Sequence, residues 1–215
     1  MGHITKKTAY FDIDINSDSK NILIIQKWKY EWLANGFSSW THEERQKMHK
    51  SFERVIDGTW SNNAKVKISG NSKYAELYQK ETFSVTFDVQ WITGTPFHFK
   101  VEVRKVAPKD YSNIPNVQWS RNLIQLYSID TTALAKVGAP AGIKQKNVAH
   151  EFGHAIGNTS GIRGMHADEY KTSSPYFEEK SSIMNVGMQL KKRHFDYLQT
   201  ELNTMIPNTR FTITL

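Results

Sequence analysis

Two runs near the start of the chain are typical of β-strands, the first because apolar and polar residues alternate along it and the second because it is apolar and aromatic. The first run is Tyr10–Ile15 and the second is Asn21–Leu33. Between them lies Asn16–Lys20, a cluster of turn-forming residues. We therefore expect these two strands to form a β-hairpin.

The strongest alternation comes later, in Thr82–Trp91 and Phe97–Val106, where alternate residues are aromatic or valine. Gly94–Pro96 separates the two runs and has the composition of a turn. This pattern predicts a second hairpin. His98 falls on the polar face of its strand, so we expect its side chain to be solvated. A further strand is expected at Leu123–Tyr127.

Three segments have helical periodicity. The first begins at Thr41, an N-cap residue with Glu44 in the capping-box position. The second is Lys144–Ile156 and the third is an amphipathic segment from Leu190 to Met205. The apolar residues that we assign to the inner faces of the first and third helices are Met48, Phe52, Val55, Ile56, Trp60, Phe195, Leu198 and Leu202.

Strands dominate residues 1–143, with one long helix, whereas residues 144–215 combine two helices with irregular segments. The 215 residues are enough for one full hydrophobic core, and no change of composition marks a domain boundary. The sequence therefore predicts a single α+β domain that spans residues 1–215 and is built on a mixed β-sheet.

The chain contains no cysteine, so a metal ion would have to be held by His, Asp or Glu. Its net charge is +7, which we interpret as a solvated surface; no basic and aromatic patch indicates a nucleic-acid partner. No run approaches the roughly 18 apolar residues of a membrane span. No apolar segment follows the first residues, so we expect a cytosolic protein, one exported by a route that reads no signal peptide, or a fragment of a larger protein.

The sequence His150-Glu151-x-x-His154 carries the chemistry that stands out. On a helix, positions i and i+4 lie on the same face, so both imidazoles can aim at one point about 2 Å away, as Zn²⁺ requires. Glu151 can reach a water on that ion without binding the ion, which is the position of a general base. The apolar residues around the motif indicate a buried helix, where free His and Glu would be costly. Gly157 can end the helix in a left-handed cap.

The run HEFGHAIGN…DEY…SIMN resembles zinc metallopeptidases of the zincin superfamily with a metzincin-like layout. In particular it resembles the metallopeptidase toxin domain at the C-terminus of VgrG-type spike proteins of type VI secretion systems. The similar regions are residues 40–60 and 145–196. The resemblance implies a zincin-like fold, bound Zn²⁺ and hydrolysis of peptide bonds.

The resemblance also frames the search for a third zinc ligand. The metzincin motif would place it at Ser160, which is a poor ligand. The nearby segment offers Glu169 and Asp168, which rank close together, with His166 behind them. A carboxylate is therefore expected, and the sequence leaves open which one.

Two further roles follow from the resemblance. Met184 would form the floor of the site in a tight methionine turn, which supplies packing rather than coordination. A Tyr, His or Arg near the end of such sites often binds the oxyanion of the tetrahedral intermediate. His194 is the first choice for this residue and Tyr170 the second.

The expected function is that of a zinc metalloendopeptidase with Glu151 as general base. The substrate would add as an extra strand at Phe97–Val106 or Leu123–Tyr127. The resemblance implies a secreted antibacterial effector that acts in the target cell envelope or periplasm, with an immunity protein and a secretion spike or adaptor as partners. The alternatives are a zinc amidase acting on peptidoglycan cross-links and a binding module that a metal merely stabilises. The substrate and the oligomeric state stay open.

Overall fold

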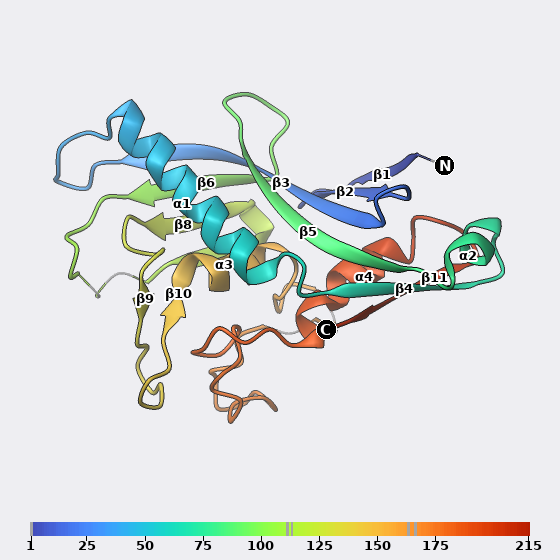
Figure 1. Ribbon diagram of the computed structural model, residues 1–215. Helices are drawn as coiled ribbons and strands as arrows, with labels where there is room; N and C mark the ends of the chain where they lie inside the picture. Colours follow the sequence, from blue (N-terminus) through green and yellow to red (C-terminus); the bar gives the residue numbers. More distant parts are fainter. Residues whose placement is uncertain (1, 111, 113, 163, 166) are drawn as a thin grey trace.

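A single mixed sheet forms the frame of the protein, seen here in a computed structural model that describes residues 2–110, 112, 114–162, 164–165 and 167–215 (Figure 1). Nine strands belong to it, and the main path has the order β11-β4-β5-β3-β6-β8-β7. β1 and β2 join it through β3. The strands are β1 (His3–Lys7), β2 (Asp12–Asn16), β3 (Asn21–Leu33), β4 (Lys65–Gly70), β5 (Thr82–Trp91), β6 (Phe99–Arg104), β7 (Asn116–Gln118), β8 (Leu123–Tyr127) and β11 (Thr209–Thr214).

Few helices accompany the sheet. The two central helices, α1 (His42–Trp60) and α3 (Asn147–Ala155), pack against one face of it (Figure 1). Trp60 at the end of α1 contacts Phe152 of α3, and Phe87 of β5 contacts the rings of both. The core therefore lies between these helices and the sheet. The helices are α1 (His42–Trp60), α2 (Lys73–Tyr78), α3 (Asn147–Ala155) and α4 (Asp196–Leu202), with short 3-10 turns at Trp119–Arg121 and Lys192–Phe195. The chain forms a single mixed α+β domain, as predicted.

The first predicted hairpin and the first predicted helix are confirmed. β2 pairs with β3 in antiparallel register, with Asp12 opposite Ile25. The Thr41 hydroxyl accepts from the Glu44 amide while the Glu44 carboxylate accepts from the Thr41 amide, which is the expected capping box. Trp60 is fully buried, and its indole nitrogen donates to the Ala149 carbonyl at 3.0 Å. Its role is packing.

The predicted second hairpin is wrong. β5 and β6 do not pair with each other; both pair in parallel with β3, β5 along its first part and β6 along its last part. β3 has 13 residues and is long enough to accept a new partner where an earlier one ends. Alternation shows which face of a strand is buried but does not identify its neighbour.

The expectation of a solvated His98 is also wrong, since only 6% of this residue is exposed. His98 lies between the end of the β2–β3 pairing and the start of the β3–β6 pairing. Its Nδ1 accepts from the Lys27 amide at 2.9 Å, and its Nε2 lies 3.2 Å from an Asp12 carboxylate oxygen. The imidazole therefore accepts the hydrogen bond of the Lys27 amide in β3, at the junction where neither β2 nor β6 pairs with it.

The last part of the chain departs from prediction in a second way. The helix expected over Leu190–Met205 is a 3-10 turn followed by the shorter α4, although the three inner residues assigned to it are buried as expected. β11 follows and forms one edge of the sheet beside β4, an element that the sequence did not reveal.

Position in the sheet also corrects the expected substrate strand. β6 lies between β3 and β8, and β8 lies between β6 and β7. β6 is paired along both sides, and β7 covers Leu123–Gln125 of β8, so neither strand offers a full free edge to a further strand. The edge on this side of the sheet is β7, a short antiparallel strand beside β8. Within the part of the chain that the structure describes, no helix is long and apolar enough to cross a membrane.

Candidate metal centre

The helix that carries the histidines, α3, is held in the interior at both ends. A two-stranded hairpin of β9 (Ala133–Leu134) and β10 (Gln145–Lys146) leads into it. Along its length Gly153 leaves room for neighbours, because a Cβ there would lie 2.5 Å from the Met184 sulfur and 3.0 Å from the Trp60 ring. At its end Gly157 has a φ of +116°, as a terminating glycine requires. The helix is thus buried on nearly every side, as the apolar motif residues predict.

His150 and His154 are oriented by hydrogen bonds from their inner ring nitrogens. Nδ1 of His150 donates to the Ile183 carbonyl at 2.6 Å, and Nδ1 of His154 donates to the Asn158 carbonyl at 2.6 Å. These bonds direct the two Nε2 atoms toward each other at 3.2 Å, and in the neutral imidazoles they make Nε2 the nitrogen that can bind a metal ion. Two ligands about 2.0–2.1 Å from a tetrahedral Zn²⁺ lie about 3.3 Å apart, so the spacing fits a shared ion.

Asp168 completes this group. Its Oδ1 lies 3.2 Å from Nε2 of His154, and its Oδ2 lies 2.7 Å from the ammonium of Lys171. One ligand atom from each of His150, His154 and Asp168 lies within 4.8 Å of the other two. Burial opposes ionisation of Asp168, but hydrogen bonds from His154 and Lys171 outweigh it and hold the pKa well below its usual range. The three residues could therefore hold a metal ion.

Glu169, the other expected carboxylate ligand, is not in this group. Its side chain lies 2.6 and 3.0 Å from two nitrogens of Arg193 and 3.2 Å from Nε2 of His194. The Glu169 carboxylate is thus turned toward Arg193 and His194, whereas the Asp168 carboxylate faces His154. His166, the third alternative, lies outside the described residues.

Glu151 lies in the same cleft as the three candidate ligands. The cleft has a volume of about 220 Å³. It is lined by Pro115, Asn116, Val117, His150, Glu151, His154, Thr159, Ser160, Ala167, Asp168 and Tyr170. Burial raises the pKa of Glu151 to about 7 against the opposing effect of His154, whereas burial and His154 lower the pKa of His150 to about 3. A carboxyl with a pKa near neutrality suits proton transfer.

His194 does not reach the cleft, which argues against its expected role at the oxyanion. It is buried, its Nδ1 accepts from the Lys191 amide at 3.1 Å, and its Nε2 faces Glu169. Tyr170, the second choice, does line the cleft, with 45% of the residue exposed. Burial of its hydroxyl and the nearby Asp168 carboxylate raise its pKa well above the usual value, so it stays a proton donor.

The turn around Met184 forms the floor beneath α3. Amides of Asn185 and Gly187 both donate to the Ser182 carbonyl, and Met184 is fully buried. Sequence reasoning missed the residue that closes this turn: the Gln145 amide group donates to the Ile183, Asn185 and Gly187 carbonyls at 2.8, 3.1 and 2.8 Å. A glutamine one turn before a metal motif gives no sequence signal for such a role.

Compared with protein-family models, with curated proteins and with solved structures, the chain shows no match to any of them. The chemistry of the site is therefore interpreted from its own geometry.

Proposed function

We propose that the protein is a zinc-dependent metalloendopeptidase with a zincin-like fold. The observation that carries this proposal is the convergence of His150, His154 and Asp168 beside Glu151 in one cleft. Three protein ligands leave a fourth position for water, which is the arrangement of catalytic rather than structural zinc sites. A site that served only to stabilise the fold would have no use for a buried glutamate whose pKa is about 7.

The donor set favours Zn²⁺ over other common ions. Two neutral imidazoles and one carboxylate match the ligand types of catalytic zinc, whereas Ca²⁺ and Mg²⁺ prefer oxygen ligands only. The carbonyls of Ile183 and Asn158 orient the two imidazoles in the manner of outer hydrogen-bond partners at zinc sites. When bound, the ion would lower the pKa of a water ligand and polarise the substrate carbonyl.

The residues of the chain would divide the remaining chemistry between them. Glu151 accepts the proton of the attacking water and delivers it to the leaving amine nitrogen. Tyr170 donates its phenolic proton in a hydrogen bond to the developing oxyanion, a role that its place in the cleft and its raised pKa support.

The substrate would bind as an added strand along β7. Asn116 and Val117 of this edge strand line the cleft that contains Glu151 and the three candidate ligands. An extended peptide on this edge would therefore run past the catalytic residues.

The proposed setting rests on the sequence resemblance alone. It is that of a secreted effector, acting in the envelope or periplasm of a target cell and opposed by an immunity protein. In that setting cross-link peptides of peptidoglycan are the alternative substrate, and the assay below separates the two.

The test combines metal analysis with hydrolysis of unfolded protein and of purified sacculi. We expect one zinc per chain, with hydrolysis lost on chelation and restored by Zn²⁺. Glu151→Gln is expected to keep the zinc and lose at least about 10³-fold in kcat, because the proton acceptor is gone. Tyr170→Phe should also keep zinc, with kcat reduced about 10²-fold.

Asp168→Ala should lose the zinc, and Lys171→Ala, which removes only the outer partner of Asp168, is its control. A wild-type protein that is folded but binds no zinc would refute the proposal. Activity on sacculi alone would identify the cross-link amidase instead.

A further inference from the structure

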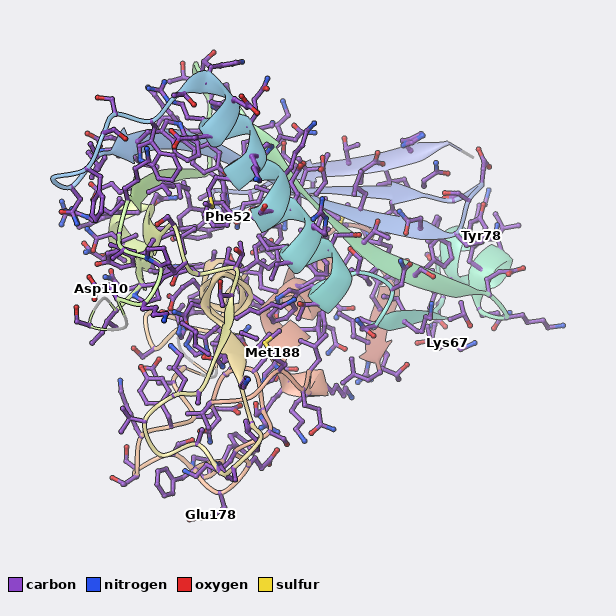
Figure 2. The ribbon with its side chains drawn as sticks, turned by 60° about the vertical axis from the view of Figure 1, so that its left-hand side comes forward. Phe52, Lys67, Tyr78, Asp110, Glu178 and Met188 are labelled. Carbon is purple, nitrogen blue, oxygen red and sulfur yellow. The ribbon has the colours of Figure 1, made fainter. Side chains whose placement is uncertain are left out.

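Asp168 stands on a segment with no regular secondary structure. Between α3 and the methionine turn, residues 158–162, 164–165 and 167–181 form neither helix nor strand. Figure 2 shows Glu178 at the outermost part of this segment, away from α1. A metal ligand must be held within about 0.5 Å of its productive position, which an irregular segment does not ensure by itself. Something else must fix Asp168.

The residue after Asp168 is fixed at three points. The Glu169 amide donates to the Met184 carbonyl at 2.9 Å, and its own carbonyl accepts from the Asn185 side chain at 3.2 Å. Its carboxylate, in a residue that is 1% exposed, receives two parallel hydrogen bonds from Arg193. Such a bidentate pair sets the direction as well as the distance of both groups.

Arg193 extends the same contact to the far part of the segment. Its Nη2 lies 3.0 Å from a Glu179 carboxylate oxygen, and the guanidinium carbon lies 3.7 Å above the Tyr176 ring. The side-chain amide of Asn185 also donates to the Tyr176 and Phe177 carbonyls. Arg193 itself belongs to the 3-10 turn that precedes α4, so it joins both parts of the segment to a packed element.

We propose that Arg193 and Glu169 form a positioning pair that holds Asp168 against the histidines. Neither residue touches the metal ion; they act through the backbone of Asp168 and Glu169. This inference rests on the proposed function, since it assigns a role at the same site. It also explains why the buried carboxylate of Glu169 is directed away from the histidines: it serves the support of the site rather than its ligand set.

The test measures metal affinity rather than activity. Arg193→Lys retains the charge but loses the two parallel bonds, and Glu169→Gln retains the shape but loses the charge. Both should weaken Zn²⁺ binding about 10- to 100-fold, as loss of outer-shell partners does, while still binding one Co²⁺ with the wild-type absorption spectrum. Glu178→Gln, which removes the charge of the exposed side chain next to Glu179 in the same segment, is the control and should change affinity less than about threefold.

A second readout uses metal-free protein. Lys171 is an exposed trypsin site within the segment. Cleavage there should become at least several-fold faster in Arg193→Lys and Glu169→Gln, and should stay at the wild-type rate in Glu178→Gln. This readout reports on the pair even in a wild-type protein that binds no zinc, an outcome that would refute the proposed function only.

Wild-type zinc affinity and wild-type cleavage in both variants would overturn the positioning role. So would complete loss of metal and of the Co²⁺ spectrum in Glu169→Gln, because that result would make Glu169 a ligand. Should Arg193→Lys be recovered unfolded, Glu169→Gln decides the matter by itself: weakened zinc with a retained spectrum supports the pair, and unchanged affinity overturns it.

Discussion

Glu151 is an acid placed where the fold favours its neutral form. It is 4% exposed, and burial is the main cause of its raised pKa, with Asp130 adding to the effect and His154 and Lys136 opposing it. Asp130 is itself buried, and burial raises its pKa to about 6. A positive ion at the histidines would favour the ionised form of Glu151, so metal binding and ionisation of this proposed general base would support each other.

The metal-free protein should therefore lose stability as Glu151 is forced to ionise. An unfolded chain ionises this residue near pH 4.5, whereas the folded chain keeps its proton to about pH 7. The stabilising contribution is complete below pH 4.5 and is lost as the pH rises through 7. Glu151→Gln should thus match the wild type near pH 4.5 and exceed it by up to about 3 kcal/mol above pH 7. Denaturant unfolding in the presence of a chelator, from pH 4.5 to 8.5, measures the difference.

A difference between the two proteins that stays constant over this range would contradict the assignment of a raised pKa. The same titration with saturating Zn²⁺ is the control. There the stabilising effect of glutamine should shrink, because the bound ion would already favour the charged carboxylate of the wild type.

At the scale of elements, the end of α3 depends on a single glycine. Gly157 combines a φ of +116° with a close approach to α4, since a Cβ would lie 2.5 Å from the Cβ of Tyr197. Gly157→Ala meets both strain in the backbone and a clash with a packed ring, so it should lower the free energy of unfolding by about 2–4 kcal/mol. The His154 imidazole donates to the carbonyl of Asn158, the residue after Gly157. The zinc affinity should therefore fall as well.

Gly58 provides the matched control. It lies inside α1, and a Cβ added there would meet nothing within 4 Å. Gly58→Ala should raise the free energy of unfolding by about 0.5–1 kcal/mol, since alanine restricts the unfolded chain and favours a helix. Equal effects of the two substitutions would show that Tyr197 moves aside and that α3 does not end in a fixed position.

The elements that the sequence predicted well are those with local signals. The capping box at Thr41 and the turn cluster at Asn16–Lys20 depend on residues a few positions apart, and both predictions are confirmed. The pairing of β5 and β6 with β3, and the edge strand β11, depend on contacts between distant segments. Alternation contains no information about such partners, which is why the second hairpin was predicted wrongly.

The candidate site shows the same division. His150, Glu151 and His154 share one helix turn, so their convergence could be predicted from spacing. Asp168 and Glu169 are neighbours on an irregular segment, and only the positions of Arg193 and the methionine turn decide which carboxylate faces the histidines. The oxyanion role expected of His194 is disfavoured for the same reason: its Nε2 faces Glu169, a contact between distant positions that the sequence does not show.

On the scale of the whole molecule, the sheet presents one edge to the candidate metal centre. β7 runs antiparallel to β8, whereas β8 and β6 run parallel to β3. A substrate strand added outside β7 would lie beside the cleft, whose lining comes from β7, from α3 and from residues 159, 160, 167, 168 and 170. The residues that line the cleft come from separated parts of the chain, so the cleft exists only when the sheet, α3 and the segment after α3 are assembled.

Strand addition along β7 makes a prediction about the peptide backbone that side-chain preferences do not. In an extended chain, successive N–H groups point to opposite sides, so only every second one can bond to the edge strand. A series of peptides, each N-methylated at one position near the scissile bond, should therefore alternate in kcat/KM. Methylation at positions that face β7 removes a hydrogen bond of about 0.5–1.5 kcal/mol and adds a clash, so a loss of at least about tenfold is expected. Methylation at the intervening positions should cost less than about threefold.

The unmethylated peptide and the scissile amide itself, methylated in a separate peptide, are the controls. Equal losses at all positions, or none, would contradict binding on β7 while leaving the metal centre as proposed, because the ligands and Glu151 do not depend on how the peptide backbone is held.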